Sequence, residues 1–260
     1  PLCAEAARVI AAIVAPVPVV SLDTRNPLLD RHRTLDGLSL FEVGPAPEAE
    51  ATVIVQHVLP TFGDRPFAVI DDGGVYARGL AEAIRLQAMD AGLEPTEVAN
   101  FRPLQRTQKP LLRRLARSGI EALVVAADAE DVSTIANDLA ELGLDWPVVT
   151  GEPARLLPFV EGASSVPDGL LAIMPVDVPD AIANALKPRL VFQDDDVSDT
   201  LVMGHALMSI ALNYDPTKPL SETGSPSLLG LLTFAEDARA TPLPMAVHRW
   251  QNGAFVRARP

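Results

Sequence analysis

Strand-like and helix-like segments alternate through most of this chain, and that alternation limits the folds open to it. The short runs at 67–71 and 122–127 are mostly apolar and have the length of buried strands. Each leads into a longer segment with helical character, at about 75–91 after the first run and 131–142 after the second. Alternation at this spacing indicates βαβ units and a largely parallel sheet, so the predicted fold class is α/β.

Other expected elements lie on either side of this region. Two expected helices run into Gly92 and Gly143, which suit the left-handed position that ends a helix. Asn252-Gly253 lies between two short apolar stretches and predicts a β-hairpin. Asp194 to Asp196 are expected to complement the positive end of the dipole of the next helix. A metal site is the less favoured interpretation, because side chains of sequence neighbours point in different directions. Further helices are expected at about 4–14, 47–59, 109–118 and 197–212, and strands at about 17–22, 38–43, 97–101, 147–150 and 169–174.

The composition fits a folded protein and argues against several partners. With 260 residues, of which 48% are hydrophobic, the chain can form one large domain or two ordinary ones. A net charge of −13 argues against nucleic acid and anionic membranes, because both are bound through clustered Lys and Arg. The apolar runs are shorter than a membrane span. Cys3 is the single cysteine, which excludes an internal disulfide and a cysteine-rich zinc site.

The turn after the strand at 67–71 is the first candidate for a binding site. Asp71, Asp72 and two glycines turn the chain, and Tyr76 stands at the start of the next helix. In an open α/β sheet, ligands bind beyond the carboxyl ends of the strands. The three side chains are therefore placed where a small molecule would be recognised. The alternative interpretation is a capped helix start with a solvated turn.

The patterns of common enzymes do not occur in this sequence. The glycines at 73, 74 and 79 lack the Gly-x-Gly-x-x-Gly spacing, and there is no Gly-x-Ser-x-Gly elbow. Asp71 and Asp72 are adjacent and point apart, which makes them a poor acid–base pair. We therefore expect a protein that is not an enzyme and that uses no cofactor or metal. The histidines are scattered without metal-ligand spacing, at His32, His57, His205 and His248.

Short segments in the same order resemble periplasmic solute-binding proteins of the leucine/isoleucine/valine-binding type. Residues 66–81 resemble "VIYDDSPYGQGLA" of that family, and residues 19–27 resemble "ISPSATNP". Leu2-Cys3 is similar to the "LC" before a small-residue ligand loop, and 150–152 to a loop that supplies an acidic residue. Residues 169–171 resemble "EGVLV", and the tail resembles "YAVYQWQDGKFV". The order of these pieces along nearly the whole chain carries the resemblance.

The resemblance implies two Rossmann-like lobes of the periplasmic binding protein type I, joined by three hinge crossings. With crossings near Ala46, Pro175 and Phe234, lobe one comprises 1–46 plus 176–234, and lobe two comprises 47–175 plus 235–260. Relatives begin lobe one with about two and a half further βαβ units, on the order of 75 residues. We therefore expect an incomplete first lobe, with an upstream stretch missing or a partner covering the gap. The same absence would leave Cys3 alone, since some relatives pair it with an upstream cysteine.

The function implied by the resemblance is that of an extracytoplasmic receptor. It would capture an amino acid or a related small molecule and hand it to an ABC permease in the membrane, with no nucleic-acid partner. Ligand would shift an equilibrium between open and closed lobes. No signal segment opens this sequence, so export never happens or the signal has been removed. The alternative is a ligand-free regulatory or protein-interaction scaffold of the same fold.

The resemblance also places ligand contacts on both lobes. Tyr76, Glu152 and Asp128, together with Asp71, are expected on lobe two, where Glu152 would pair with a ligand ammonium. Lobe one would contribute Asp23, Thr24 and Arg25. Ala4 stands where relatives have a serine, Arg25 where they have a threonine, and Asp128 where many have a tyrosine. These departures point away from ordinary leucine recognition. Asp71, Asp128 and Glu152 together favour a ligand with a cationic group. Arg25 is either a carboxylate ligand or a solvated loop residue.

Overall fold

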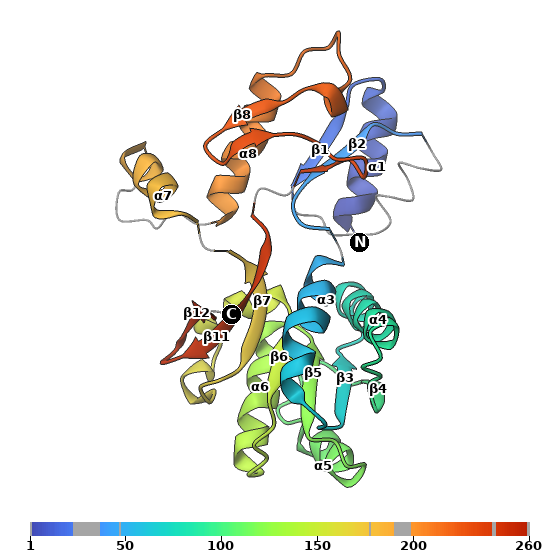
Figure 1. Cartoon of the computed structure of the whole chain (residues 1–260), viewed down its shortest axis with the longest axis vertical. Coiled ribbons are helices and arrows are strands. Elements are labelled where there is room, and N and C mark those ends of the chain that lie inside the picture. Colours follow the sequence, from blue (N-terminus) through green and yellow to red (C-terminus); the bar gives the residue numbers. More distant parts are fainter. Residues whose placement is uncertain are drawn as a thin grey trace. The chain divides into compact units, whose positions relative to one another are not determined.

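The computed structural model describes residues 2–22, 37–46, 48–176, 178–189, 199–240 and 243–258. Its contacts divide the chain into two units, drawn in Figure 1. Unit 1 comprises Pro1–Pro47 and Val176–Pro244, and unit 2 comprises Glu48–Pro175 and Met245–Pro260. The third crossing therefore falls after Pro244 instead of near Phe234. The reason is strand β10 (Arg239–Ala240), which the sequence analysis missed and which pairs with β2 (Leu40–Val43) inside unit 1.

Unit 2 is built on a seven-stranded sheet in the order β12-β11-β7-β6-β5-β3-β4. The central strands are parallel, as the alternation of segments predicted, whereas β11 and β12 form an antiparallel hairpin. Asn252 and Gly253 take φ angles of 50° and 82° at the hairpin turn, which is the conformation that Asn-Gly favours. The strands are β3 (Phe67–Asp71), β4 (Glu97–Asn100), β5 (Ala122–Ala126), β6 (Val148–Thr150), β7 (Leu171–Pro175), β11 (Met245–Gln251) and β12 (Ala254–Arg257).

Helices cover both faces of this sheet, which explains why its central strands β3, β5, β6 and β7 are largely apolar. One face packs Val69 and Val124 against helix α3 (Ala49–Val53), the π-helical turn that continues it (Ile54–Val58), and helix α4 (Val75–Asp90). The other face packs Ile70 and Leu123 against α5 (Lys109–Arg117) and α6 (Ala129–Glu141). Neighbouring strand residues point to opposite faces, so the two cores share one sheet. Short 3-10 segments complete the unit at Leu59–Phe62, Glu152–Phe159 and Ala163–Ser165.

Unit 1 is built on a smaller parallel sheet in the order β1-β2-β10, with β1 at Val19–Leu22. Helix α1 (Leu2–Val14) packs Ala7 and Ala11 beside Leu40. Helix α8 (Asp199–Leu212) packs apolar residues on Val43. Asp194 to Asp196, expected at the start of α8, lie outside the described residues. The remaining elements are α7 (Asp180–Leu186), the 3-10 segments Lys187–Arg189 and Leu220–Glu222, and the hairpin of β8 (Ser225–Ser227) and β9 (Gly230–Leu232).

The length and apolar character of the helices decide whether any of them could span a membrane. None of those in the described ranges combines the length and the apolar character needed to cross a bilayer.

Candidate functional site

The carboxyl ends of β3, β5 and β6 lie at one edge of the sheet of unit 2, where these strands are neighbours. The predicted site residues of unit 2 all follow these ends. Asp71 is the last residue of β3, and Tyr76 is in the first turn of α4. Asp128 precedes α6, and Glu152 begins the 3-10 segment after β6. This edge is where ligands bind in open α/β sheets, so the four residues form the candidate site.

The structure adds Glu50, which the sequence analysis missed. Glu50 lies in the first turn of α3 and is only 2% exposed. Its Oε2 atom accepts a hydrogen bond from the Tyr76 hydroxyl and a second one, at 3.3 Å, from the backbone N–H of Glu152. One buried carboxylate oxygen thereby joins the segment after β3 to the segment after β6.

The spacing of apolar residues held the signal for Glu50. Ala51, Ile54, Val55 and Val58 are all buried on one side of this helical segment. Glu50 stands four positions before Ile54, and residues at that spacing share a helix face. A carboxylate on the apolar face of a helix needs hydrogen-bond partners, which predicts a polar contact inside the unit.

Gly151 lies directly against the pair of Tyr76 and Glu50. A Cβ atom at Gly151 would stand 2.3 Å from the Tyr76 hydroxyl, 2.6 Å from Glu50 Oε2 and 2.9 Å from Leu80 Cδ2. Real Cβ atoms do not come this close to other heavy atoms, so this position requires glycine because of its neighbours. The close packing holds the half-buried Tyr76 ring in place.

The carboxylate of Glu152 already forms an ion pair within unit 2. Its side chain is largely buried, and Oε1 lies 3.0 Å from Nε of Arg155, whose side chain is 41% exposed. The sequence analysis did not identify Arg155. A cationic ligand at Glu152 would have to share the carboxylate with this guanidinium or displace it.

Asp71 and Asp72 serve the turn between β3 and α4. Asp71 accepts a hydrogen bond of 2.9 Å from the backbone N–H of Gly73, and Asp72 accepts one of 2.7 Å from that of Gly74. Gly73 has a φ of 83°, which favours glycine. These contacts order the turn ahead of α4 and not the helix start itself, because the N-cap residue Gly74 makes no side-chain cap hydrogen bond.

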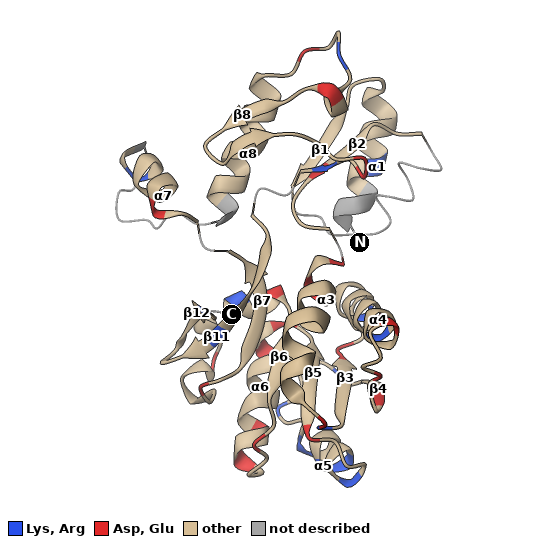
Figure 2. Ribbon diagram, in the orientation of Figure 1, with Lys and Arg blue, Asp and Glu red and all other residues tan. Residues whose placement is uncertain are grey.

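The segment after β5 adds negative charge to the same edge. Partial burial, followed by repulsion from Asp72 and Glu130, raises the pKa of Asp128. Asp131 is 1% exposed and accepts the N–H of Leu104 at 2.9 Å. Burial raises the pKa of Asp131, and repulsion from Asp72, Asp128 and Glu130 adds to this rise. The hydrogen bond from Leu104 acts in the opposite direction but does not cancel it. Basic residues of unit 2 gather on α5 instead (Figure 2). The described residues contain no group of carboxylates, histidines and cysteines arranged to hold a metal ion.

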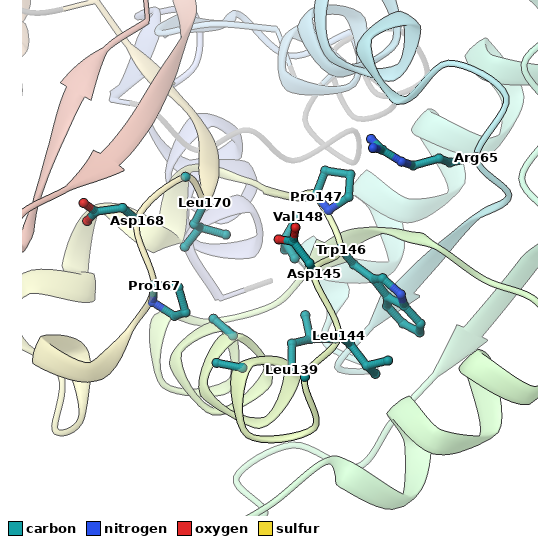
Figure 3. Close-up of a pocket in the computed structure, with 14 residues that line it drawn as sticks. Arg65, Leu139, Leu144, Asp145, Trp146, Pro147, Val148, Pro167, Asp168 and Leu170 are labelled. Carbon is teal, nitrogen blue, oxygen red and sulfur yellow. The ribbon is translucent and has the colours of Figure 1, made fainter.

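A separate pocket of about 500 Å³ lies at the amino ends of β6 and β7, the opposite edge of this sheet (Figure 3). Its charged residues, Arg65, Asp145 and Asp168, are all exposed. Asp168 accepts the backbone N–H of Asn252 at 2.9 Å. Small-molecule sites place a few polar groups within an apolar lining, whereas the three charged residues of this pocket are exposed to solvent. The candidate site therefore stays at the carboxyl edge. The pocket's apolar lining includes Leu139, Leu144, Trp146, Val148 and Leu170.

The predicted contacts of unit 1 follow β1, which ends at Leu22. Asp23, Thr24 and Arg25 lie outside the described residues, so their role stays a prediction.

Comparison of the sequence with known proteins gives a distant relative. No protein-family model matches the chain. The Leu/Ile/Val-binding protein BraC3 of Rhizobium johnstonii is 22% identical over 226 residues. The match covers 81% of this chain and 61% of BraC3, so the chain spans less than two thirds of that relative.

Solved structures share the fold over almost the whole chain. The leucine-binding protein LivK of Thermotoga maritima matches with a TM-score of 0.78 at 17% identity, covering 98% of this chain and 76% of LivK. The branched-chain amino acid transporter substrate-binding protein LivJ of Streptococcus pneumoniae, in complex with isoleucine, matches with a TM-score of 0.66 at 16% identity, covering 98% and 84%. These matches confirm the predicted type I fold and the resemblance to Leu/Ile/Val-binding proteins. All three relatives are named as binding proteins. The incomplete first lobe stays a prediction.

Proposed function

We propose that this chain, with its fold and its likeness to Leu/Ile/Val-binding proteins, is a solute-binding receptor and not an enzyme. It would bind an amino acid or a related molecule with a cationic nitrogen outside the cytoplasm and deliver it to an ABC permease. The observation that carries the proposal is the gathering of Tyr76, Asp128 and Glu152 at the carboxyl edge of one parallel sheet. BraC3 is named for Leu, Ile and Val binding, and LivJ holds isoleucine, which supports an amino acid as the ligand.

The chemistry of the site favours the cationic end of such a ligand. Glu152 and Asp128 offer carboxylate oxygens, which form charge-assisted hydrogen bonds with an ammonium group. Such bonds are roughly twice as strong as neutral ones. The additional carboxylates near α6 make the electrostatic potential at this edge more negative, and a more negative potential concentrates cations there. Asp23, Thr24 and Arg25 remain the proposed contacts from unit 1.

A second candidate is a scaffold that no longer binds a ligand. The observation in its favour is that Glu152 pairs with Arg155 and that the Tyr76 hydroxyl is bonded to Glu50. Both predicted contacts therefore have partners within unit 2. A thermal-shift screen with amino acids, amides and small carboxylates separates the two candidates. A receptor gains about 2.7 kcal/mol of stability at ligand concentrations of about a hundred times Kd.

Glu152→Gln tests the role of the carboxylate. We expect it to weaken a cationic ligand by about 1.5–3 kcal/mol, the scale of a hydrogen bond to a charged group. Binding of a neutral or anionic ligand should stay nearly unchanged. Glu141→Gln makes the same chemical change at an exposed position near the end of α6 and is the matched control. Isothermal titration calorimetry gives both affinities, and equal losses for the two variants would refute the assignment.

A further inference from the structure

We infer that Glu50 fixes the hydrogen-bond polarity of Tyr76, so that Tyr76 faces a ligand as an acceptor and not as a donor. A tyrosine hydroxyl has one proton to donate. The Tyr76 hydroxyl directs it to Oε2 of Glu50. The inference rests on the proposed function, because it names the ligand groups that the same site accepts.

The second bond to Glu50 supports this direction. The backbone N–H of Glu152 lies 3.3 Å from the same Oε2 atom, and an N–H can only donate. This oxygen therefore accepts from two groups, as a carboxylate oxygen does. Glu50 is almost fully buried, so water competes little for it, and its charge needs these donors.

Packing around Gly151 keeps the hydroxyl where it is. The space in which a Cβ atom at Gly151 would lie is filled by the Tyr76 hydroxyl, Glu50 Oε2 and a methyl group of Leu80. The Tyr76 ring is therefore held against the backbone after β6. A ligand that needed the proton of Tyr76 would have to break the bond to Glu50 and leave a buried carboxylate short of a donor, which is costly.

The consequence is a set of acceptors in unit 2, formed by Tyr76, Glu152 and Asp128, in which the Arg155 guanidinium already pairs with Glu152. The phenol oxygen of Tyr76 and the carboxylates of Glu152 and Asp128 suit the N–H donors of an ammonium, amidinium or guanidinium group. A ligand carboxylate finds no donor in Tyr76. The amino group is therefore the part of an amino acid that unit 2 recognises, and Glu50 is the residue that determines this specificity.

Raman spectroscopy tests the hydrogen bond without any ligand. Tyr76 and Tyr214 are the only tyrosines of the chain, so Tyr214→Phe leaves the signal of Tyr76 alone. The intensity ratio of the tyrosine doublet is low for a donating hydroxyl. We expect a low ratio in this background, a higher one after Glu50→Met, which removes the acceptor, and a low one after Glu50→Gln, which keeps an oxygen. A high ratio in the Tyr214→Phe protein itself would overturn the inference, even if no Glu50 variant folds.

Calorimetry with three probes tests the specificity. L-leucine has both charged groups, L-leucinamide keeps only the amine, and 4-methylpentanoate keeps only the carboxylate. We expect L-leucinamide to bind within a few-fold of L-leucine, and 4-methylpentanoate not to bind. In Glu50→Met the released hydroxyl can donate to a carboxylate, so L-leucine should gain about tenfold over L-leucinamide. Adding Tyr76→Phe should abolish that gain, whereas a merely structural role of Glu50 would weaken all probes alike.

The two tests separate the inference from the proposed function. If no probe binds while the Raman ratio is low, the polarity of Tyr76 stands and the amino-acid receptor fails. If L-leucine and 4-methylpentanoate bind and L-leucinamide does not, the receptor stands and the inference is wrong.

Discussion

Unit 2 and unit 1 use the same α/β construction with sheets of very different size. The sheet of unit 2 has seven strands and helices on both faces, and Ile70, Leu123 and Trp250 are at most 1% exposed. The described part of unit 1 has a parallel sheet of three strands with β1 at its edge. Its helix α1 leaves Ile10 and Ile13 exposed, at 49% and 76%. Because apolar burial provides most of the stability of a fold, we expect the stability of this chain to be concentrated in unit 2.

A matched pair of isoleucines gives the largest expected contrast. Ile70→Ala removes a fully buried side chain between the sheet and the layer of α5 and α6, and it should cost about 2–5 kcal/mol. Ile13→Ala changes an exposed position of α1 and should cost under about 0.5 kcal/mol. Urea unfolding measures both. Trp146 and Trp250 lie in unit 2, so their fluorescence follows that unit, and circular dichroism follows the whole chain.

The stability cost of Ile13→Ala can contradict this comparison of the two units. A cost near that of Ile70→Ala would mean that the outer face of α1 is covered in solution. That outcome would favour the predicted incomplete lobe, with its gap filled by a partner or by further chain.

The difference between the units also separates what the sequence can predict from what it cannot. In unit 2 the strand at 67–71, the turn at Asn252-Gly253 and the glycine after α6 match the predictions, because local patterns dictate them. The glycine at 143 has the left-handed φ of 69° that its place after a helix predicts. Strand β10 in unit 1 has only two residues. Such a segment has no periodicity of its own and exists through its pairing with β2.

The candidate site divides in the same way. The positions of Tyr76, Asp128 and Glu152 follow from one rule about strand ends, so the sequence alone could place them. Their partners could not be placed by that rule. Glu50 precedes Glu152 by about a hundred residues in the chain and meets it only after the sheet has formed. The apolar spacing around Glu50 indicates a buried carboxylate with a polar partner, but nothing local to that helix says which segment supplies the partner.

Gly151→Ala is the next largest expected effect and sharpens the view of unit 2 as closely packed. The new methyl group would collide with Tyr76 and Glu50, and overpacking of this kind costs about 1–3 kcal/mol. The controls are Gly79→Ala in α4 and Gly204→Ala in α8, where a Cβ atom meets nothing within 4 Å. Within a helix, alanine should stabilise by about 0.5–1 kcal/mol over glycine. Urea unfolding distinguishes the signs, and a neutral Gly151→Ala would show that the site is looser than described.

The smallest expected effect is a pH dependence of opposite sign at two carboxyl groups, Asp131 in unit 2 and Asp215 in unit 1. In unit 2, burial raises the pKa of Asp131, so the folded state holds its proton more tightly than the unfolded chain. Stability from this group is present at low pH and is lost as pH rises from about 4 through the raised pKa. In unit 1, hydrogen bonds from the hydroxyl and N–H of Thr217 lower the pKa of Asp215. That contribution is present above about pH 4 and is lost as pH falls through the lowered pKa.

Asp131→Asn and Asp215→Asn test the two signs. Asparagine keeps an acceptor oxygen for the N–H of Leu104 but has no charge to repel Asp72, Asp128 and Glu130. We therefore expect Asp131→Asn to remove part of the loss of unit 2 stability between about pH 4 and neutral pH, measured by tryptophan fluorescence in urea. Asp215→Asn should leave that curve unchanged and should flatten the acid response of unit 1, measured by hydrogen exchange in α8. Since Asp131 is buried and Asp215 stands at the surface, the first change should exceed the second. If the slope of unit 2 stability against pH were unchanged in Asp131→Asn, the pH dependence of unit 2 would have to come from other groups.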